Sequence, residues 1–137
     1  KFIVSGDIAK LPADLVSAIE NAVKKTKDCQ RMLVNLCINY GGRFDILRAV
    51  NTLLGEKKES VTYKDFENAL YTHEMHELDL VVRTSGEQRI SNFMLYQMAY
   101  AELYFTKTYW PDFDKKALNE ALIDFQSRNR RFGAIKE

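Results

Sequence analysis

Two arginines and a serine stand close together in a short polar segment that follows an apolar run. Arg83 ends the run LDLVVR, and Arg89 and Ser91 follow it in the segment TSGEQRIS. Guanidinium groups keep their charge at any relevant pH and bind phosphate oxygens through paired hydrogen bonds. Ser91 adds a hydroxyl, and a helix starting there would add unpaired amides at the positive end of its dipole. These residue types predict an anion pocket suited to a diphosphate.

The same residues also have a purely structural interpretation. Arg89 and Ser91 share one side of the chain only if the loop is extended there, because alternate residues of an extended segment point the same way. The arginines can instead pair with Glu87 or Glu102, and Ser91 can simply cap a helix. The residues alone leave the diphosphate pocket and the salt bridges equally open.

Glu102 is the second candidate, because it stands in the apolar and aromatic run AYAELYF. Burying a carboxylate is costly unless the group is paired or binds a cation. Mg²⁺ suits one or two protein carboxylates together with phosphate oxygens. A salt bridge to a nearby arginine explains the same residue more simply, and the sequence alone favours it over a metal.

Three other motifs are weaker. His73, Glu74 and His76 have the spacing H-E-x-H rather than the H-E-x-x-H of zinc proteases, and with no third ligand in sight we expect surface histidines. The glycine pair of NYGGR, at 39–43, could let a phosphate approach the backbone, but a tight turn explains it equally well. RNRRFG, at 128–133, could bind acidic groups, although a solvated helix end is the favoured interpretation.

The elements that must position these residues alternate between strands and helices. Apolar runs predict strands at 1–5, 32–38 and 78–82, and the second run is apolar enough to be covered on both faces. Alternation of this kind predicts an α/β fold, with a largely parallel sheet flanked by helices. Ligands of such sheets bind outside the carboxyl ends of the strands, which is where Arg83 stands.

Helical spacing of apolar residues and capping residues predict five helices. One begins near Pro12, and a short one starts with a capping box of Thr62 and Asp65. Another begins at Ser91, and residues 100–105 either continue it or form a strand. The last follows Asp114, and the remaining one has an apolar face of Phe44, Leu47, Val50 and Leu54.

Size and composition indicate a single globular domain over residues 1–137, with 46% hydrophobic and 28% charged residues. The net charge of +1 offers no global basic field, so no nucleic-acid partner is expected. The two cysteines, Cys29 and Cys37, form no disulfide framework and suggest a reducing compartment, with Cys37 buried as a small hydrophobe. No run is long and apolar enough to predict a transmembrane helix.

One long segment, LVVRTSGEQRISNFMLYQMAYAELYFTKTYWPDF, closely resembles the signature region of the cis-prenyltransferases, in particular the bacterial undecaprenyl diphosphate synthases. NYGGRFDI and RNRRFG resemble two further segments of that family, so the likeness covers nearly the whole chain. The resemblance implies the cis-prenyltransferase fold. It also implies condensation of isopentenyl diphosphate with an allylic diphosphate, usually farnesyl diphosphate, to give a long cis-polyprenyl diphosphate for the cell-wall lipid carrier.

The resemblance also implies roles for particular residues. Arg83, Arg89 and Ser91 would hold the diphosphate of isopentenyl diphosphate, and Ile90 would also belong to the substrate-binding residues. Glu102 would help to bind Mg²⁺, in one arrangement from the neighbouring subunit. The family further implies a homodimer whose interface includes residues of the run from Tyr96 to Trp110. A cytoplasmic location follows, with contact to the membrane through the product.

The sequence departs from the family at two points. Gln88 stands where many relatives have histidine. The amino-terminal motif Asp-Gly-Asn-Gly-Arg, which supplies the catalytic aspartate and a second magnesium carboxylate, is absent from these 137 residues. We therefore expect a fold that is incomplete at the amino terminus, a catalytic residue outside this chain, and no activity of the chain alone. The alternative is a non-catalytic partner subunit, or a remnant, of a heteromeric cis-prenyltransferase, but a scaffold has no need of the intact RTSGEQRIS loop.

Overall fold

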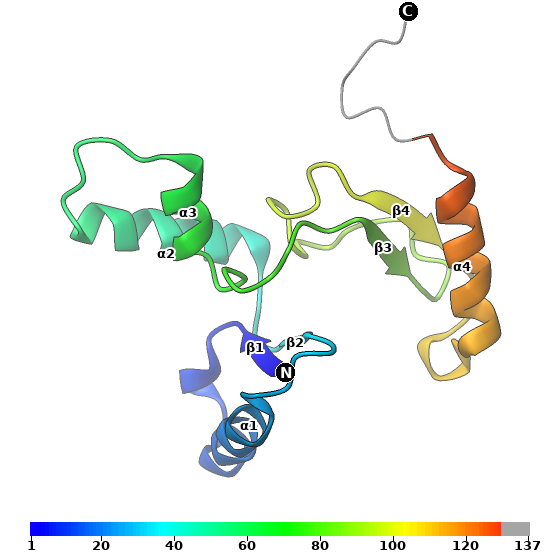
Figure 1. The fold of residues 1–137 in the computed structure, drawn as a ribbon, viewed down its shortest axis with the longest axis horizontal. Helices are drawn as coiled ribbons and strands as arrows, with labels where there is room; N and C mark the ends of the chain where they lie inside the picture. The colour runs from blue at the N-terminus through cyan, green and yellow to red at the C-terminus, as the bar shows by residue number, and fades with distance from the viewer. Residues whose placement is uncertain (130–137) are drawn as a thin grey trace, which may run out of the picture. The chain divides into compact units, whose positions relative to one another are not determined.

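The computed structural model describes residues 1–129, which divide into two compact units, Lys1–His76 and the part that begins at Glu77 (Figure 1). Each unit holds one pair of parallel strands together with helices, so the predicted α/β class is confirmed. β1 (Phe2–Ser5) pairs with β2 (Val34–Cys37) in the first unit, and β3 (Leu80–Arg83) pairs with β4 (Glu102–Phe105) in the second. A single domain over the whole chain stays a prediction.

The first unit is built on a strand–helix–strand crossover. α1 (Ala13–Thr26) joins the two parallel strands after a short 3₁₀ turn at Ile8–Lys10, and it packs against β1. The helix end is tied to the first strand, because the backbone amide of Phe2 donates to the hydroxyl of Thr26 at 2.9 Å. Ile3 on the strand and Ile19 on the helix are both buried, as apolar residues of a crossover must be.

The turn after β1 requires a glycine. Gly6 has a φ of 131°, and a Cβ atom there would lie 2.0 Å from the carbonyl oxygen of Ile38. The amide of Asp7 donates to the carbonyl of Asn39 at 3.3 Å, so the backbone that follows β1 stays hydrogen-bonded to the backbone that follows β2. A side chain at position 6 would therefore have to separate the two strand ends.

β2 is shorter and more exposed than the apolar run at 32–38 predicted. Val34 and Leu36 expose 45% and 46% of their surface, so the expectation of a strand covered on both faces is wrong. Cys37 is half-buried rather than buried. A continuous apolar run favours burial, but the neighbouring elements that would cover it are not encoded in the run itself.

Two helices follow β2 and lie side by side, α2 (Gly42–Gly55) and α3 (Tyr63–Ala69) (Figure 1). The predicted capping box of α3 is confirmed, since the amide of Asp65 donates to the Thr62 hydroxyl and the Asp65 carboxylate accepts from the Thr62 amide. The predicted apolar face of α2 is wrong, because all four of its residues are at least 40% exposed. The buried residues of α2 are Gly42, Asp45, Ala49 and Leu53.

A buried carboxylate explains which side of α2 faces inward. Asp45 is 1% exposed and accepts hydrogen bonds from the backbone amide of Tyr71 at 2.9 Å and from the Arg48 guanidinium at 3.4 Å. Arg48 also donates to the carbonyl of Ala69 at 2.6 Å, and its guanidinium lies 3.8 Å from the centre of the Tyr71 ring. This network fixes α2 to the end of α3.

The second unit places a long connection between its two parallel strands. Leu80 lies opposite Glu102 and Arg83 opposite Phe105, and residues 84–101 join the strands. The undecided segment at 100–105 therefore contains a strand. After a 3₁₀ turn at Trp110–Asp112, α4 (Lys115–Ser127) packs against β4 (Figure 1), with its predicted cap Asp114 accepting from the amide of Ala117 at 2.9 Å.

Among residues 1–129, no helix combines the length and the apolar character needed to cross a bilayer.

Candidate functional site

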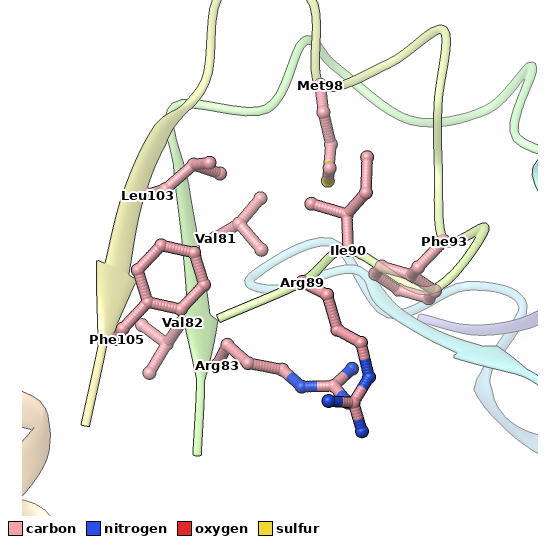
Figure 2. A pocket seen from close by; sticks show the side chains of 9 residues that line it. All are labelled: Val81, Val82, Arg83, Arg89, Ile90, Phe93, Met98, Leu103 and Phe105. Carbon is pink, nitrogen blue, oxygen red and sulfur yellow. The ribbon is translucent and has the colours of Figure 1, made fainter. Parts of the chain in front are cut away.

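A pocket of about 250 Å³ opens beside the paired strands of the second unit (Figure 2). Seven apolar side chains and two arginines line it. These are Val81, Val82, Arg83, Arg89, Ile90, Phe93, Met98, Leu103 and Phe105. The arginines supply the only charges among the lining residues. An apolar wall beside two cationic groups suits an anion that carries a hydrocarbon part.

Arg83 and Arg89 reach the pocket from a strand and from a connecting segment, respectively. Arg83 is the last residue of β3, and the amide of Thr106 donates to its carbonyl at 2.9 Å, so the strand pairing continues past this residue. Arg89 lies in the connecting segment, is 64% exposed and pairs with Glu87. Figure 2 shows both guanidiniums extending to the same side of the pocket. The sheet therefore fixes one arginine, and the other can adjust to a ligand.

The start of the connecting segment is held against the residues that follow β4. The amides of Ser85 and Gly86 donate to the carbonyls of Thr108 and Thr106, each at 2.8 Å. Both residues have left-handed backbone conformations, with φ of 68° and 71°. This conformation is cheap for Gly86 and strained for Ser85. The tight turn brings the chain from the end of β3 back toward Arg89.

The helix predicted to begin at Ser91 is not formed. Ser91, Asn92 and Met94 have φ values of 48°, 62° and 42°, which a right-handed helix excludes. A series of turns takes its place, and the Met94 side chain is 4% exposed, so the segment folds to bury this residue instead of to continue a helix. Ser91 is exposed and does not line the pocket. The predicted helix amides and dipole therefore contribute nothing to the anion site.

Glu102 lies at the other end of the strand pair from Arg83. Because Leu80 faces Glu102 and Arg83 faces Phe105, the two candidates are separated by three residues of strand. At the usual rise this is about 10 Å. Glu102 does not line the pocket. Within one chain, the structure brings together Arg83, Arg89 and Ile90, and it leaves Ser91 and Glu102 outside.

Glu102 is paired with Arg128, the first residue of the RNRRFG motif. Arg128 Nη1 donates to Glu102 Oε2 at 2.9 Å and to the carbonyl of Leu103 at 3.0 Å, while its Nη2 lies 2.6 Å from Asp124 Oδ2. The salt-bridge interpretation of Glu102 is therefore confirmed. RNRRFG was the available signal, because the motif could bind acidic groups, although a solvated helix end was the favoured interpretation. Residues 130–133 of the RNRRFG motif lie outside the described residues.

The weaker motifs can be placed as well. His73 and His76 are both exposed, and the pairing of Glu74 with Lys1 lowers the pKa of Glu74. In residues 1–129, no three histidine, cysteine, aspartate or glutamate side chains gather in a way that could hold a metal ion. The glycines of NYGGR lead from β2 into α2, with Gly42 as the first helical residue.

The Glu102 carboxylate fits a Mg²⁺ site in which water and phosphate oxygens supply the other ligands. One carboxylate is too few for a site built from protein alone, but Mg²⁺ is commonly held by one or two carboxylates, water and phosphate oxygens. Arg128 contacts one carboxylate oxygen, Oε2, and a carboxylate has a second. Glu102 can therefore serve as one ligand of a Mg²⁺ ion that a diphosphate also binds.

Comparison with known proteins gives a consistent result. The family model described as "Putative undecaprenyl diphosphate synthase" matches residues 1–133. The chain is 44% identical over 136 residues to an isoprenyl transferase of Fusobacterium nucleatum, covering 99% of this chain and 59% of that protein. It is also 44% identical over 143 residues to a Pasteurella multocida ditrans,polycis-undecaprenyl-diphosphate synthase specific for (2E,6E)-farnesyl diphosphate, covering 100% of this chain and 60% of that enzyme. The chain thus spans about three fifths of the length of these curated relatives.

Two solved structures share the fold. Lavandulyl diphosphate synthase from Lavandula x intermedia, crystallised with dimethylallyl diphosphate, has a TM-score of 0.94 and 34% identity, covering 98% of this chain and 60% of that one. A probable undecaprenyl diphosphate synthase from Campylobacter jejuni has a TM-score of 0.87 and 31% identity, covering 98% of this chain and 63% of that one.

Proposed function

This chain belongs to the undecaprenyl diphosphate synthase family of prenyltransferases, and on that premise we propose that it provides the isopentenyl diphosphate site of an enzyme that condenses isopentenyl diphosphate with farnesyl diphosphate. The product would be a long-chain cis-polyprenyl diphosphate, the precursor of a cell-wall lipid carrier. The observation that carries this proposal is the pocket at the end of β3, where Arg83 and Arg89 adjoin an apolar wall.

The pocket residues have a simple division of labour. Arg83, fixed by the sheet, and the more exposed Arg89 bind the diphosphate oxygens, since guanidiniums favour such oxygens and remain charged. Ile90 and the other apolar lining residues face the hydrocarbon part and keep water from it. Ser91 would donate its hydroxyl to the diphosphate only if the turn at this residue changes, because Ser91 is outside the pocket.

The reaction itself sets what these groups must do. The allylic carbon loses its diphosphate, the double bond of isopentenyl diphosphate supplies the electron pair for the new carbon–carbon bond, and a proton leaves to form the new double bond. Arg83 and Arg89 would hold isopentenyl diphosphate so that its double bond faces the allylic carbon, which is catalysis by positioning. No residue of this chain is assigned as the catalytic group, because the motif expected to supply it is absent from the 137 residues.

Glu102 would act with Mg²⁺ at a site completed by a second copy of the chain. Its place at the far end of the strand pair from Arg83 supports this assignment, since one chain does not bring the carboxylate to its own arginines. Mg²⁺, when bound, would neutralise negative charge on the diphosphates. A homodimer follows from the proposal, and a cytoplasmic enzyme whose long apolar product leads it to the membrane fits the same chemistry.

Replacement of Arg89 by alanine tests the substrate assignment. The variant is made in a protein that combines this chain with the amino-terminal portion that its relatives carry. Loss of a charge-assisted hydrogen bond should raise the KM for isopentenyl diphosphate about tenfold or more, with a smaller effect on the KM for farnesyl diphosphate.

Lys107→Ala is the matched control, because it removes one exposed positive charge near the same turn without touching the pocket lining. An Arg89→Ala variant with the KM of the Lys107→Ala control would refute the assignment. The 137-residue chain, assayed alone, should show no turnover, since we propose that the catalytic group is not among its residues.

A further inference from the structure

Arg128 connects the start of β4 to α4. It follows α4 directly, and its guanidinium contacts Glu102 and Leu103 at the start of β4 and Asp124 on α4. The side chains of Arg128 and Glu102 are 30% and 28% exposed, so the pair is partly shielded from water but still open to a solute. This arrangement ties the end of α4 to the residue that we assign to Mg²⁺.

The contact puts one cation beside the place where another would bind. A guanidinium and a divalent cation are both attracted to the negative charge of a carboxylate, so a metal on either oxygen of Glu102 would lie close to the Arg128 guanidinium and be repelled by it. Asp124, at 2.6 Å from Arg128, gives the arginine a second carboxylate partner. Arg128 can therefore release Glu102 without leaving its own charge unpaired, which lowers the cost of the exchange.

We propose that Arg128 is a positioning residue that holds Glu102 in a paired, resting state, and that a divalent cation displaces it. The inference rests on the proposed function, which assigns Glu102 to the metal. In the resting state Arg128 neutralises Glu102 and fixes its carboxylate beside β4. In the metal-bound state Glu102 would be a ligand of the metal, and Arg128 would remain paired with Asp124. Metal binding is thereby coupled to the contacts of the Arg128 side chain with β4.

The test measures binding of Mn²⁺ to the whole chain by water-proton relaxation, with and without inorganic pyrophosphate. Arg128→Gln removes the competing charge and should lower the Mn²⁺ dissociation constant about two- to fivefold, as expected from the strength of a partly exposed ion pair. Arg128→Lys keeps the charge but loses the two-sided fork, so its dissociation constant should lie between those of the wild type and Arg128→Gln.

Two further variants separate the possible failures. Glu102→Gln should abolish the part of the Mn²⁺ binding that pyrophosphate strengthens, and if it does not, the metal assignment within the proposed function is wrong. If Glu102→Gln abolishes this binding but neither Arg128 variant tightens it, the proposed function stands and the resting-state pairing is overturned. Arg31→Gln, which removes an exposed arginine of the first unit, controls for the change in net charge. Tightening by Arg31→Gln equal to that of Arg128→Gln would also overturn the pairing.

Local unfolding of α4 would also free Glu102, so the Arg128 variants are compared with the wild type by circular dichroism. Tighter Mn²⁺ binding supports the pairing when the helix content is unchanged, and tightening seen only with lost helix content would overturn it. The carboxyl ¹³C resonance of Glu102 gives an independent readout in the metal-free state. It should shift in Arg128→Gln and remain unchanged in Arg31→Gln, and an unchanged resonance in Arg128→Gln would contradict the pairing.

Discussion

The two units each contain a carboxylate–arginine pair, and the pairs differ in how they meet water. Asp45 and Arg48 stand three residues apart on α2, and Asp45 is 1% exposed. Glu102 and Arg128 come from β4 and the end of α4, and both are between a quarter and a third exposed. The arginines are about equally exposed, at 31% and 30%, so the pairs differ in the carboxylate, which is sealed from water in the first unit and accessible in the second.

The difference in exposure indicates which carboxylate can exchange its partner for a ligand. A buried carboxylate that loses its partner keeps the cost of its dehydration, so Asp45 cannot be given to a ligand without loss of structure. A partly exposed carboxylate can exchange its partner for water or a cation at small cost. Burial, more than the residue types, makes Asp45 a structural residue and leaves Glu102 able to exchange its partner.

Among the substitutions that test this difference between the two pairs, the largest effect is expected at Asp45. Asp45→Ala removes the acceptor of the Tyr71 amide and the partner of Arg48, and should lower the free energy of unfolding by about 3 kcal/mol. Chemical denaturation measures the change. Asp45→Asn keeps an oxygen acceptor and should cost less. A loss below 1 kcal/mol in the alanine variant would show that the buried pair does not hold α2 and α3 together.

The thiol beside the buried pair gives the next largest effect. Burial, and then the negative charge of Asp45, raise the pKa of Cys37 to about 11, whereas Cys29 is exposed. At pH 8 Cys37 should react with iodoacetamide about 20-fold more slowly than an ordinary exposed thiol, because the thiolate is the reactive form and the higher nucleophilicity of a thiolate with a raised pKa offsets only part of its lower abundance. Mass spectrometry of labelled peptides compares the two cysteines. Equal rates in the folded chain would contradict the shielding of this region.

A smaller effect is expected for the accessible pair. Glu102→Gln should lower the free energy of unfolding by less than about 1 kcal/mol, because a partly exposed ion pair contributes little. High salt should reduce the difference further, while the cost of Asp45→Ala should persist. Denaturation of both variants at low and high ionic strength makes the comparison. A Glu102→Gln variant as unstable as Asp45→Ala would remove the distinction between the two pairs.

The smallest effect concerns a third pair, Lys58 and Asp65 at the start of α3, whose side chains are 35% and 26% exposed. Hydrogen bonds from Lys58 and from Thr62 lower the pKa of Asp65 below its ordinary value of 3.8. A lowered folded-state pKa adds stability that is complete above the ordinary pKa and is lost as the pH falls through the folded-state pKa. Far-ultraviolet circular dichroism below pH 4 should show loss of α3 in the wild type. Asp65→Asn is the control, and it should lack this acid-dependent step.

Local signals in the sequence predicted several features correctly. The capping box of Thr62 and Asp65 and the cap at Asp114 were predicted because each needs only residues three positions apart. The pocket arginine Arg83 was also predicted, since an apolar run followed by a charge marks the mouth of a strand. The position of Arg128 beside Glu102 was missed, because the two are 26 residues apart and no local pattern joins them.

Two other errors have the same origin. The helix expected at Ser91 followed from its apolar spacing, but burial of Met94 and left-handed residues favoured a series of turns. The apolar face expected on α2 is exposed, because the inward side is fixed by Asp45 and its contacts with Tyr71 and Arg48. Propensity is a weak guide wherever a tertiary contact is worth more than a helical turn.

The sequence by itself determined the α/β class, the family and the identity of the candidate residues, because these depend on residue types and short spacings. Only the tertiary structure decided which of those residues meet. The parallel register places Glu102 away from Arg83, and the end of α4 places Arg128 on Glu102. The physical reason is that pairing register and packing are set by contacts between distant segments, and these contacts also decide which charges are exposed and able to bind a ligand.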